Sequence, residues 1–178
     1  MFKATPDQEY LLSVLDATKV MRKGQALSLL LNLGEGRTEA YARHCLLQLG
    51  HMRKIAWKTD DVFATPMMFN EPVDEDMLSA VDVMLDLTGT KAVSVAAGPA
   101  PFKLRFLSDR GNASKGFAIV VFNVGSERGI NDGLPAAPGG CAIIFLLSYM
   151  TQKGRVKTSL PHYFAIRDGG RYRYFRKG

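Results

Sequence analysis

The hydrophobic positions of the first fifty residues recur with the 3.6-residue period of an α-helix. Apolar residues from Tyr10 to Ala17 predict a first helix, and Pro6 with its acidic neighbours suits its first turn. A second pattern predicts a helix from Arg22 to Leu33, ended by the glycines of Gly34-Glu-Gly36. A third helix is expected from the N-cap residue Thr38 to Leu49, ended by Gly50. Its buried stripe is Ala42, Cys45, Leu46 and Leu49.

The pattern then changes to the two-residue period of a half-buried strand. Residues 54–58, Lys-Ile-Ala-Trp-Lys, alternate polar and apolar, and residues 62–65 form a second such run that Pro66 stops. The turn residues Thr59-Asp60-Asp61 lie between them. A two-stranded ribbon is therefore expected after the third helix, and alternation favours packing of Trp57 over stacking on a sugar.

The phrase ARHCLLQLGHMRKIAWKTDDVFATP, with Leu49 on the third helix and Ile55 opening the ribbon, resembles the winged helix-turn-helix superfamily. The resemblance covers residues 6–68 and implies a domain that lays its third helix in a DNA groove with the ribbon, or wing, beside it. Many winged helices contact proteins instead, so that alternative stays open.

Beyond the ribbon, a helix is expected over Asp74–Leu87, and the following residues are rich in strand patterns. Strands are predicted at Phe102–Leu107, Phe117–Val124 and Ala142–Tyr149, the last two as apolar runs covered on both faces. A short helix at 126–134, a loop at 135–140 and a hairpin at 163–175 with a Gly-Gly turn complete the pattern.

These elements predict an α+β protein: a winged helix-turn-helix followed by a small mixed α/β sheet domain of four to six strands. The expected parts are 1–70 for the winged helix, 71–90 for an acidic connecting helix and 91–178 for the sheet domain. This order also resembles the replication-relaxation family of bacterial plasmid and mobile-element proteins. That resemblance implies that the second half is a degenerate restriction-endonuclease-like sheet.

The composition predicts a packed core and a cellular location. Of the 178 residues, 47% are hydrophobic, but the longest apolar runs are strand-sized, so no membrane span is expected. The first ten residues lack the apolar stretch of a signal peptide, and Cys45 and Cys141 are far apart, which favours a reducing cytoplasm.

The net charge of +6 is unevenly distributed along the chain. Residues 71–90 hold six acidic and no basic side chains, whereas residues 91–178 hold 14 basic and four acidic ones. A basic surface raises the local concentration of polyanions, so nucleic acid is a candidate partner, and the acidic helix is expected to face away from DNA or toward a partner.

The candidate DNA-contacting residues are polar positions on or beside the third helix. They are expected to reach base edges from the helix and phosphates from its start and from the wing. The set is Arg22, Lys23, Arg37, Thr38, Arg43, His44, Gln48, Arg53, Lys54 and Lys58. Glu35 and Glu39 lie nearby and favour a protein-interaction module that no longer binds DNA.

A second basic patch lies on the C-terminal hairpin among Tyr172, Tyr174 and Phe175: Arg167, Arg171, Arg173, Arg176 and Lys177. Basic and aromatic residues interleaved on one ribbon can hold a nucleic-acid backbone. Charges on an edge hairpin also block aggregation, and this second interpretation is slightly favoured.

No catalytic set is evident, so an enzyme is not expected. A magnesium-dependent nuclease needs an acid and an acid-x-lysine pair on adjacent strands, but the strand at 119–125 holds no carboxylate. Asp109 and Glu127 could converge without the lysine, as in an inactive nuclease-like domain. The three histidines, His44, His51 and His162, lack metal-ligand spacing, and no cofactor, metal or small-molecule substrate is expected.

The sequence therefore predicts a non-catalytic cytoplasmic protein that binds double-stranded DNA and regulates replication or transcription of a bacterial mobile element. A small head makes few base contacts, so a homodimer on a paired site is expected.

Overall fold

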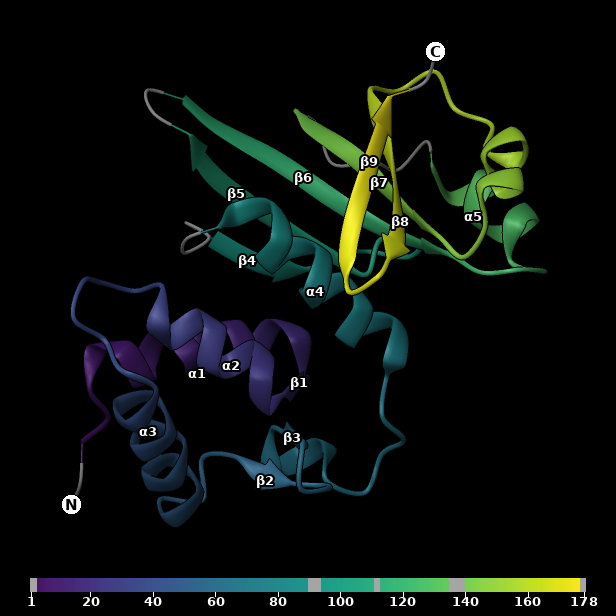
Figure 1. Cartoon of the computed structure of the whole chain (residues 1–178). Coiled ribbons are helices and arrows are strands. Elements are labelled where there is room, and N and C mark those ends of the chain that lie inside the picture. Colours follow the sequence, from purple (N-terminus) through teal and green to yellow (C-terminus); the bar gives the residue numbers. More distant parts are fainter. Residues whose placement is uncertain (1–2, 90–93, 111–112, 135–139, 177–178) are drawn as a thin grey trace. The chain divides into compact units, whose positions relative to one another are not determined.

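The computed structural model describes residues 3–89, 94–110, 113–134 and 140–176 (Figure 1). The chain divides into two compact units, 1–91 and 92–178, which are considered separately below. The mixture of helices and a large mixed sheet confirms the α+β class. Residues 135–139 of the loop predicted at 135–140, and Lys177, lie outside the described residues.

Unit 1 contains four helices. Helix α1 (Pro6–Thr18) begins at the N-cap Thr5, and α2 spans Lys23–Leu31. Helix α3 spans Glu39–His51, and α4 spans Glu75–Thr88 with Asp74 as its N-cap. All four predicted helices are present, but α2 is shorter than expected at both ends, and Gly50 lies inside α3.

A three-stranded antiparallel sheet accompanies these helices, in the order β1-β3-β2. Its strands are β1 (Val20–Arg22), β2 (Ala56–Trp57) and β3 (Val62–Ala64), and the short helix η1 (Pro66–Met68) follows. Strand β1 was not predicted. It forms where the second helix was expected to begin, because β3 pairs with Val20, Met21 and Arg22 through Ala64, Phe63 and Val62.

The acidic helix α4 packs against α2, α1 and β1 within unit 1. Gln25, which is buried, donates hydrogen bonds to the Leu78 carbonyl at 2.7 Å and to Asp82 Oδ1 at 2.6 Å. Arg22 pairs with Asp82 at 3.0 Å and with Glu75 at 3.1 Å. Part of the acidic charge of α4 is therefore neutralised inside its own unit.

Unit 2 is a six-stranded mixed sheet in sequential order (Figure 1). Its strands are β4 (Ser94–Ala97), β5 (Leu104–Arg110), β6 (Ala113–Phe122), β7 (Cys141–Leu147), β8 (His162–Asp168) and β9 (Arg171–Arg176). Strands β6, β7 and β8 are parallel, and the other neighbours are antiparallel. The predicted C-terminal hairpin is confirmed, whereas β4 was not predicted and the ends of β5, β6 and β7 differ from expectation.

A hydrophobic core cluster of unit 2 lies on one face of this sheet, and the other face also buries Leu104, Ile119 and Ile144. Helix α5 (Glu127–Gly133), predicted at 126–134, contributes Ile130, and Leu134 follows it, against Val120, Phe122 and Phe145. A second connection, η3 (Met150–Arg155), joins β7 to β8. Its Gln152 is 2% exposed and donates to the Phe122 carbonyl at 2.8 Å, so it ties the carboxyl ends of β6 and β7 together.

Within the described parts of the chain, no helix is both long and apolar enough to cross a membrane.

Candidate nucleic-acid interface

The predicted recognition helix, α3, is amphipathic. The Thr38 side chain accepts a hydrogen bond from the Tyr41 amide at 3.2 Å, which starts the helix. The predicted stripe of Ala42, Cys45, Leu46 and Leu49 is buried. The opposite side exposes Ala40, Arg43, His44, Leu47 and His51. Leu47 is 60% exposed. The predicted contacts were chosen as polar or charged residues, so this apolar side chain was not among them.

Two residues of α1 fix the position of α3. Gln8 is 1% exposed, and its amide nitrogen donates to the Cys45 carbonyl at 3.2 Å and to Gln48 Oε1 at 2.9 Å. Asp7 accepts from the Tyr41 hydroxyl at 2.8 Å and from Arg37 Nε at 2.9 Å. Two predicted DNA contacts, Arg37 and Gln48, are therefore engaged in packing between helices.

The bond to Asp7 also alters the acidity of Tyr41. The hydroxyl donates to the carboxylate, which raises the pKa of Tyr41 to about 12, and partial burial acts in the same direction. The phenol is therefore kept protonated in the folded unit. In the sequence, the first-turn position of Asp7 indicated only a favourable interaction with the helix dipole. Nothing there indicated its contacts with Tyr41 and Arg37.

Helix α3 ends in a Schellman motif. The Lys54 amide bonds to the Leu49 carbonyl and the Arg53 amide to the Gly50 carbonyl, both at 2.9 Å. Met52 is the C-cap, and Arg53 adopts a left-handed conformation with φ of 55°. This backbone projects two exposed cations, Arg53 and Lys54, directly beyond the helix.

The ribbon packs against the end of α3. The ring centroids of Trp57 and Phe63 are 5.1 Å apart in an edge-to-face arrangement, and a Cβ on Gly50 would lie 3.5 Å from the indole nitrogen. Trp57 therefore packs, as the alternation favoured. Thr59 closes the turn by accepting from the amides of Asp61 and Val62, at 3.2 and 3.0 Å.

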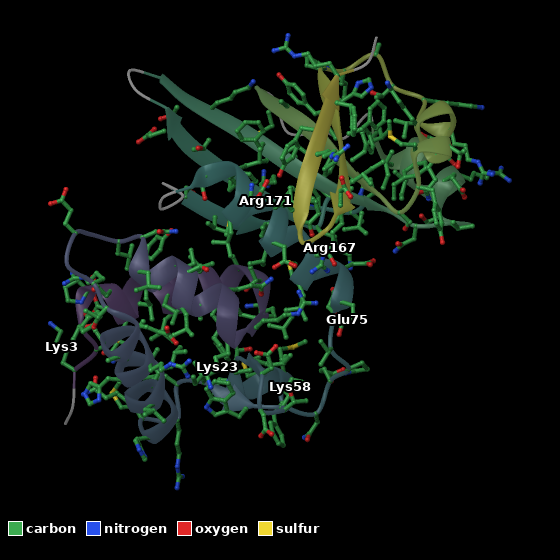
Figure 2. The ribbon with its side chains drawn as sticks, in the orientation of Figure 1. Lys3, Lys23, Lys58, Glu75, Arg167 and Arg171 are labelled. Atoms are coloured by element: carbon green, nitrogen blue, oxygen red, sulfur yellow. The ribbon has the colours of Figure 1, made fainter. Side chains whose placement is uncertain are left out.

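Lys58 is a structural residue (Figure 2). Its ammonium donates to the carbonyls of Met68 at 2.9 Å and of Phe69 and Glu71, both at 2.5 Å. These three acceptors occupy all three ammonium protons. The Lys58 side chain therefore holds the segment after β3 against the ribbon.

Two further predicted contacts also have carboxylate partners. Arg22 is held by Asp82 and Glu75 of α4, and its side chain is 28% exposed. Arg43 pairs with Glu39 one turn earlier on α3, with Nε at 2.8 Å from Oε1. The second pair is exposed, and such pairs contribute about 0.3–0.5 kcal/mol, so it can open at small cost.

Four predicted contacts have no such engagement. Lys23, His44, Arg53 and Lys54 form no side-chain hydrogen bond or ion pair with the part of the chain that the structure describes. Lys23 is the first residue of α2, and its backbone amide donates to the Asp61 carbonyl at 2.7 Å, so it lies beside the ribbon turn (Figure 2). The structure thus divides the predicted set into side chains that bond within the unit and side chains that do not.

The C-terminal ribbon carries its arginines on both faces of β9. Arg173 pairs with Asp168 at 2.6 Å, whereas Arg167 and Arg171 are exposed near the Gly-Gly turn (Figure 2). Lys115 donates to the Tyr163 hydroxyl at 3.2 Å, and this bond, with Arg176 nearby, lowers the pKa of Tyr163. The patch is therefore partly an internal network of cations around one tyrosine.

Asp109 and Glu127, the pair considered for an inactive nuclease-like domain, do not converge. Asp109 accepts a hydrogen bond from Ser114, opposite the start of β6. Glu127 follows the other end of β6 and pairs with Arg155 at 2.7 Å. Strand β6 has ten residues, so the two carboxylates are separated by roughly 30 Å along it. No cluster of three or more His, Cys, Asp or Glu side chains suited to a metal ion occurs among the described residues.

Comparisons with protein-family models, with curated proteins and with solved structures give no match.

Proposed function

We propose that unit 1 is a winged helix-turn-helix domain that binds double-stranded DNA, and that the protein is a non-catalytic regulator of replication or transcription. The observation that carries this proposal is the element order α1-β1-α2-α3-β2-β3 with the antiparallel sheet β1-β3-β2. In this arrangement the exposed surface of α3, the cations Arg53 and Lys54 and the ribbon turn follow one another between Ala40 and Asp61.

The proposed interface is smaller than the sequence suggested. Arg53, Lys54 and Lys23 contact phosphates, because their charges have no partner among the described residues. His44 and Leu47 lie on the exposed surface of α3 and face base edges, where an apolar side chain suits the thymine methyl group. Arg43 also faces base edges when its exposed ion pair with Glu39 opens.

Salt dependence tests the proposal directly. Three phosphate contacts release about three counterions, so the logarithm of affinity for a mixed-sequence duplex should fall with the logarithm of salt concentration at a slope near −3. The measurement is a fluorescence-anisotropy titration at several salt concentrations. A flat response would overturn the phosphate contacts. A much steeper slope would mean that other cations bind the duplex.

A protein-interaction module is the second candidate. The pairing of Arg37 with Asp7 and of Arg43 with Glu39 favours it, because these pairs lower the positive potential of α3, and Leu47 offers an apolar contact. Changing Lys54→Ala separates the two candidates: a DNA-binding unit loses duplex affinity, whereas the equivalent charge change Lys157→Ala in unit 2 leaves it unchanged. Equal affinity for both variants favours the interaction module.

A further inference from the structure

A cavity of about 220 Å³ opens on one face of the unit 2 sheet. Its lining includes Ser94, Ala96, Arg105, Leu107 and Cys141. These residues come from β4, β5 and the first residue of β7, so the cavity lies near the amino-terminal ends of β6 and β7. Helix α5 covers the opposite ends of the same two strands.

Small side chains create this space. Arg105 lies opposite Ala96 on one neighbouring strand and Ala118 on the other. Gly116 lies between Leu107 and Cys141, and a Cβ on this glycine would be 2.8 Å from the Cys141 sulfur. A larger side chain at Gly116 would therefore fill part of the space beside the thiol.

Arg105 brings to this cavity a cation that has no side-chain partner among the described residues. Of the buried side-chain nitrogen and oxygen atoms in the described residues, Arg105 Nε is the one without a hydrogen bond. Some arginines of unit 2 have carboxylate partners, as Arg155 has in Glu127 and Arg173 in Asp168, and Arg167 and Arg171 are exposed to solvent. A half-buried guanidinium is costly without an acceptor, and buried donors in native proteins are nearly always paired. Nε itself is buried, whereas the terminal guanidinium nitrogens are not among the buried atoms, so an acceptor from outside the protein would bond to those nitrogens in the cavity.

We propose that this cavity binds a small organic carboxylate, with its anionic group on Arg105 and its apolar part against Ala96 and Leu107. The planar guanidinium matches a carboxylate through two parallel hydrogen bonds. Ser94 adds a hydroxyl to the lining, and the other walls are apolar, which favours an organic acid over a bare inorganic anion. This binding site lies within unit 2 and is independent of DNA binding by unit 1.

Benzoate, its neutral isostere benzamide and inorganic phosphate are suitable probes of the full-length protein. Binding is followed by NMR titration, and Cys141 supplies a second readout because bound ligand should slow its alkylation by iodoacetamide. Cys45 is buried and serves as the internal reference thiol. We expect saturable benzoate binding that slows Cys141 alkylation, with benzamide and phosphate each weaker by about tenfold or more.

Changing Arg105→Gln should weaken benzoate binding about tenfold or more, because it removes the charge-assisted hydrogen bonds. The matched control is Arg128→Gln, which removes an exposed arginine of the same unit and should leave binding unchanged. Arg105→Lys keeps the charge but loses the planar geometry, so it should weaken binding less than Arg105→Gln and gives a second test if the glutamine variant does not fold.

The proposal fails if benzoate does not saturate, if benzamide binds equally well, or if Arg105→Gln binds like the unchanged protein. Binding without protection of Cys141 would place the ligand elsewhere and would also overturn it. Phosphate binding tighter than benzoate binding would overturn the organic ligand class.

Discussion

The ends of α1 and α3 each hold a non-glycine residue with positive φ, but the two side chains are used differently. Lys19 follows α1 and Arg53 follows the C-cap of α3, with φ of 65° and 55°. They are the non-glycine residues with positive φ in the described chain, at positions where glycine is usual. Lys19 pairs with Asp16 of its own helix at 3.0 Å, whereas Arg53 has no partner among the described residues.

Backbone strain of this kind must be offset by something else in the protein. A left-handed conformation costs an L-residue about 1–2 kcal/mol, and glycine recovers part of that cost. The backbone bonds of the Schellman motif form equally well with glycine, so they do not explain an arginine at position 53. Retention of a cation without an internal partner favours a role in binding an external anion.

The largest expected effect concerns the position of α3 on α1. Changing Gln8→Ala removes the donor to Cys45 O and Gln48 and should lower the free energy of unfolding of unit 1 by about 2–3 kcal/mol. The measurement is urea unfolding. The control is Ser13→Ala, an exposed residue of the same helix that bonds only to the Tyr10 carbonyl and should change stability by less than about 0.5 kcal/mol. Equal effects of both changes would mean that Gln8 does not hold α3.

The next prediction separates the two helix ends. Changing Arg53→Gly should raise the free energy of unfolding by about 0.5–1 kcal/mol, because glycine tolerates the left-handed conformation. The same change should lower duplex affinity about tenfold and reduce the magnitude of the salt slope by about one. Stability is measured by urea unfolding and affinity by fluorescence anisotropy.

Lys19→Gly is the matched control, since it makes the same backbone substitution and removes the same charge. Its gain in stability should be smaller, because the exposed pair with Asp16 is also lost, and duplex affinity should not change. If both variants lose affinity equally, net charge rather than the position of Arg53 governs binding. If neither loses affinity, Arg53 does not contact DNA.

Local sequence patterns predict some elements of this fold and miss others. Periodicity identified the helices and the strands of the ribbon and hairpin, because each of these elements has an amphipathic or capped segment of its own. Strands β1 and β4, three and four residues long, were not predicted from the local pattern. Strand β1 exists because β3 offers a pairing edge at Phe63, a tertiary influence that the residues around Met21 do not encode locally.

The candidate site was predicted from residue type, and the structure adds the partner of each side chain. The pair of Glu39 and Arg43 was visible at i, i+4 spacing, but Arg22 finds Asp82 sixty residues away, and Lys58 binds backbone carbonyls that carry no sequence signal. Arg53 was selected as a basic residue near a helix end. Its left-handed backbone is what distinguishes it from the other cations.

The smallest expected effect is a pH dependence that reports how Tyr41 joins α3 to α1. Its folded pKa of about 12 exceeds the unfolded value of 10.0, so the hydrogen bond to Asp7 contributes fully below pH 10 and is lost as the pH rises toward 12. The difference in unfolding free energy between the unchanged protein and Tyr41→Phe should therefore decrease across that window. Tyr163→Phe is the opposing control: the lowered pKa of Tyr163 makes its contribution grow as the pH rises from that lowered value toward 10. Equal trends for the two variants would show that neither tyrosine is coupled to its neighbours as the contacts indicate.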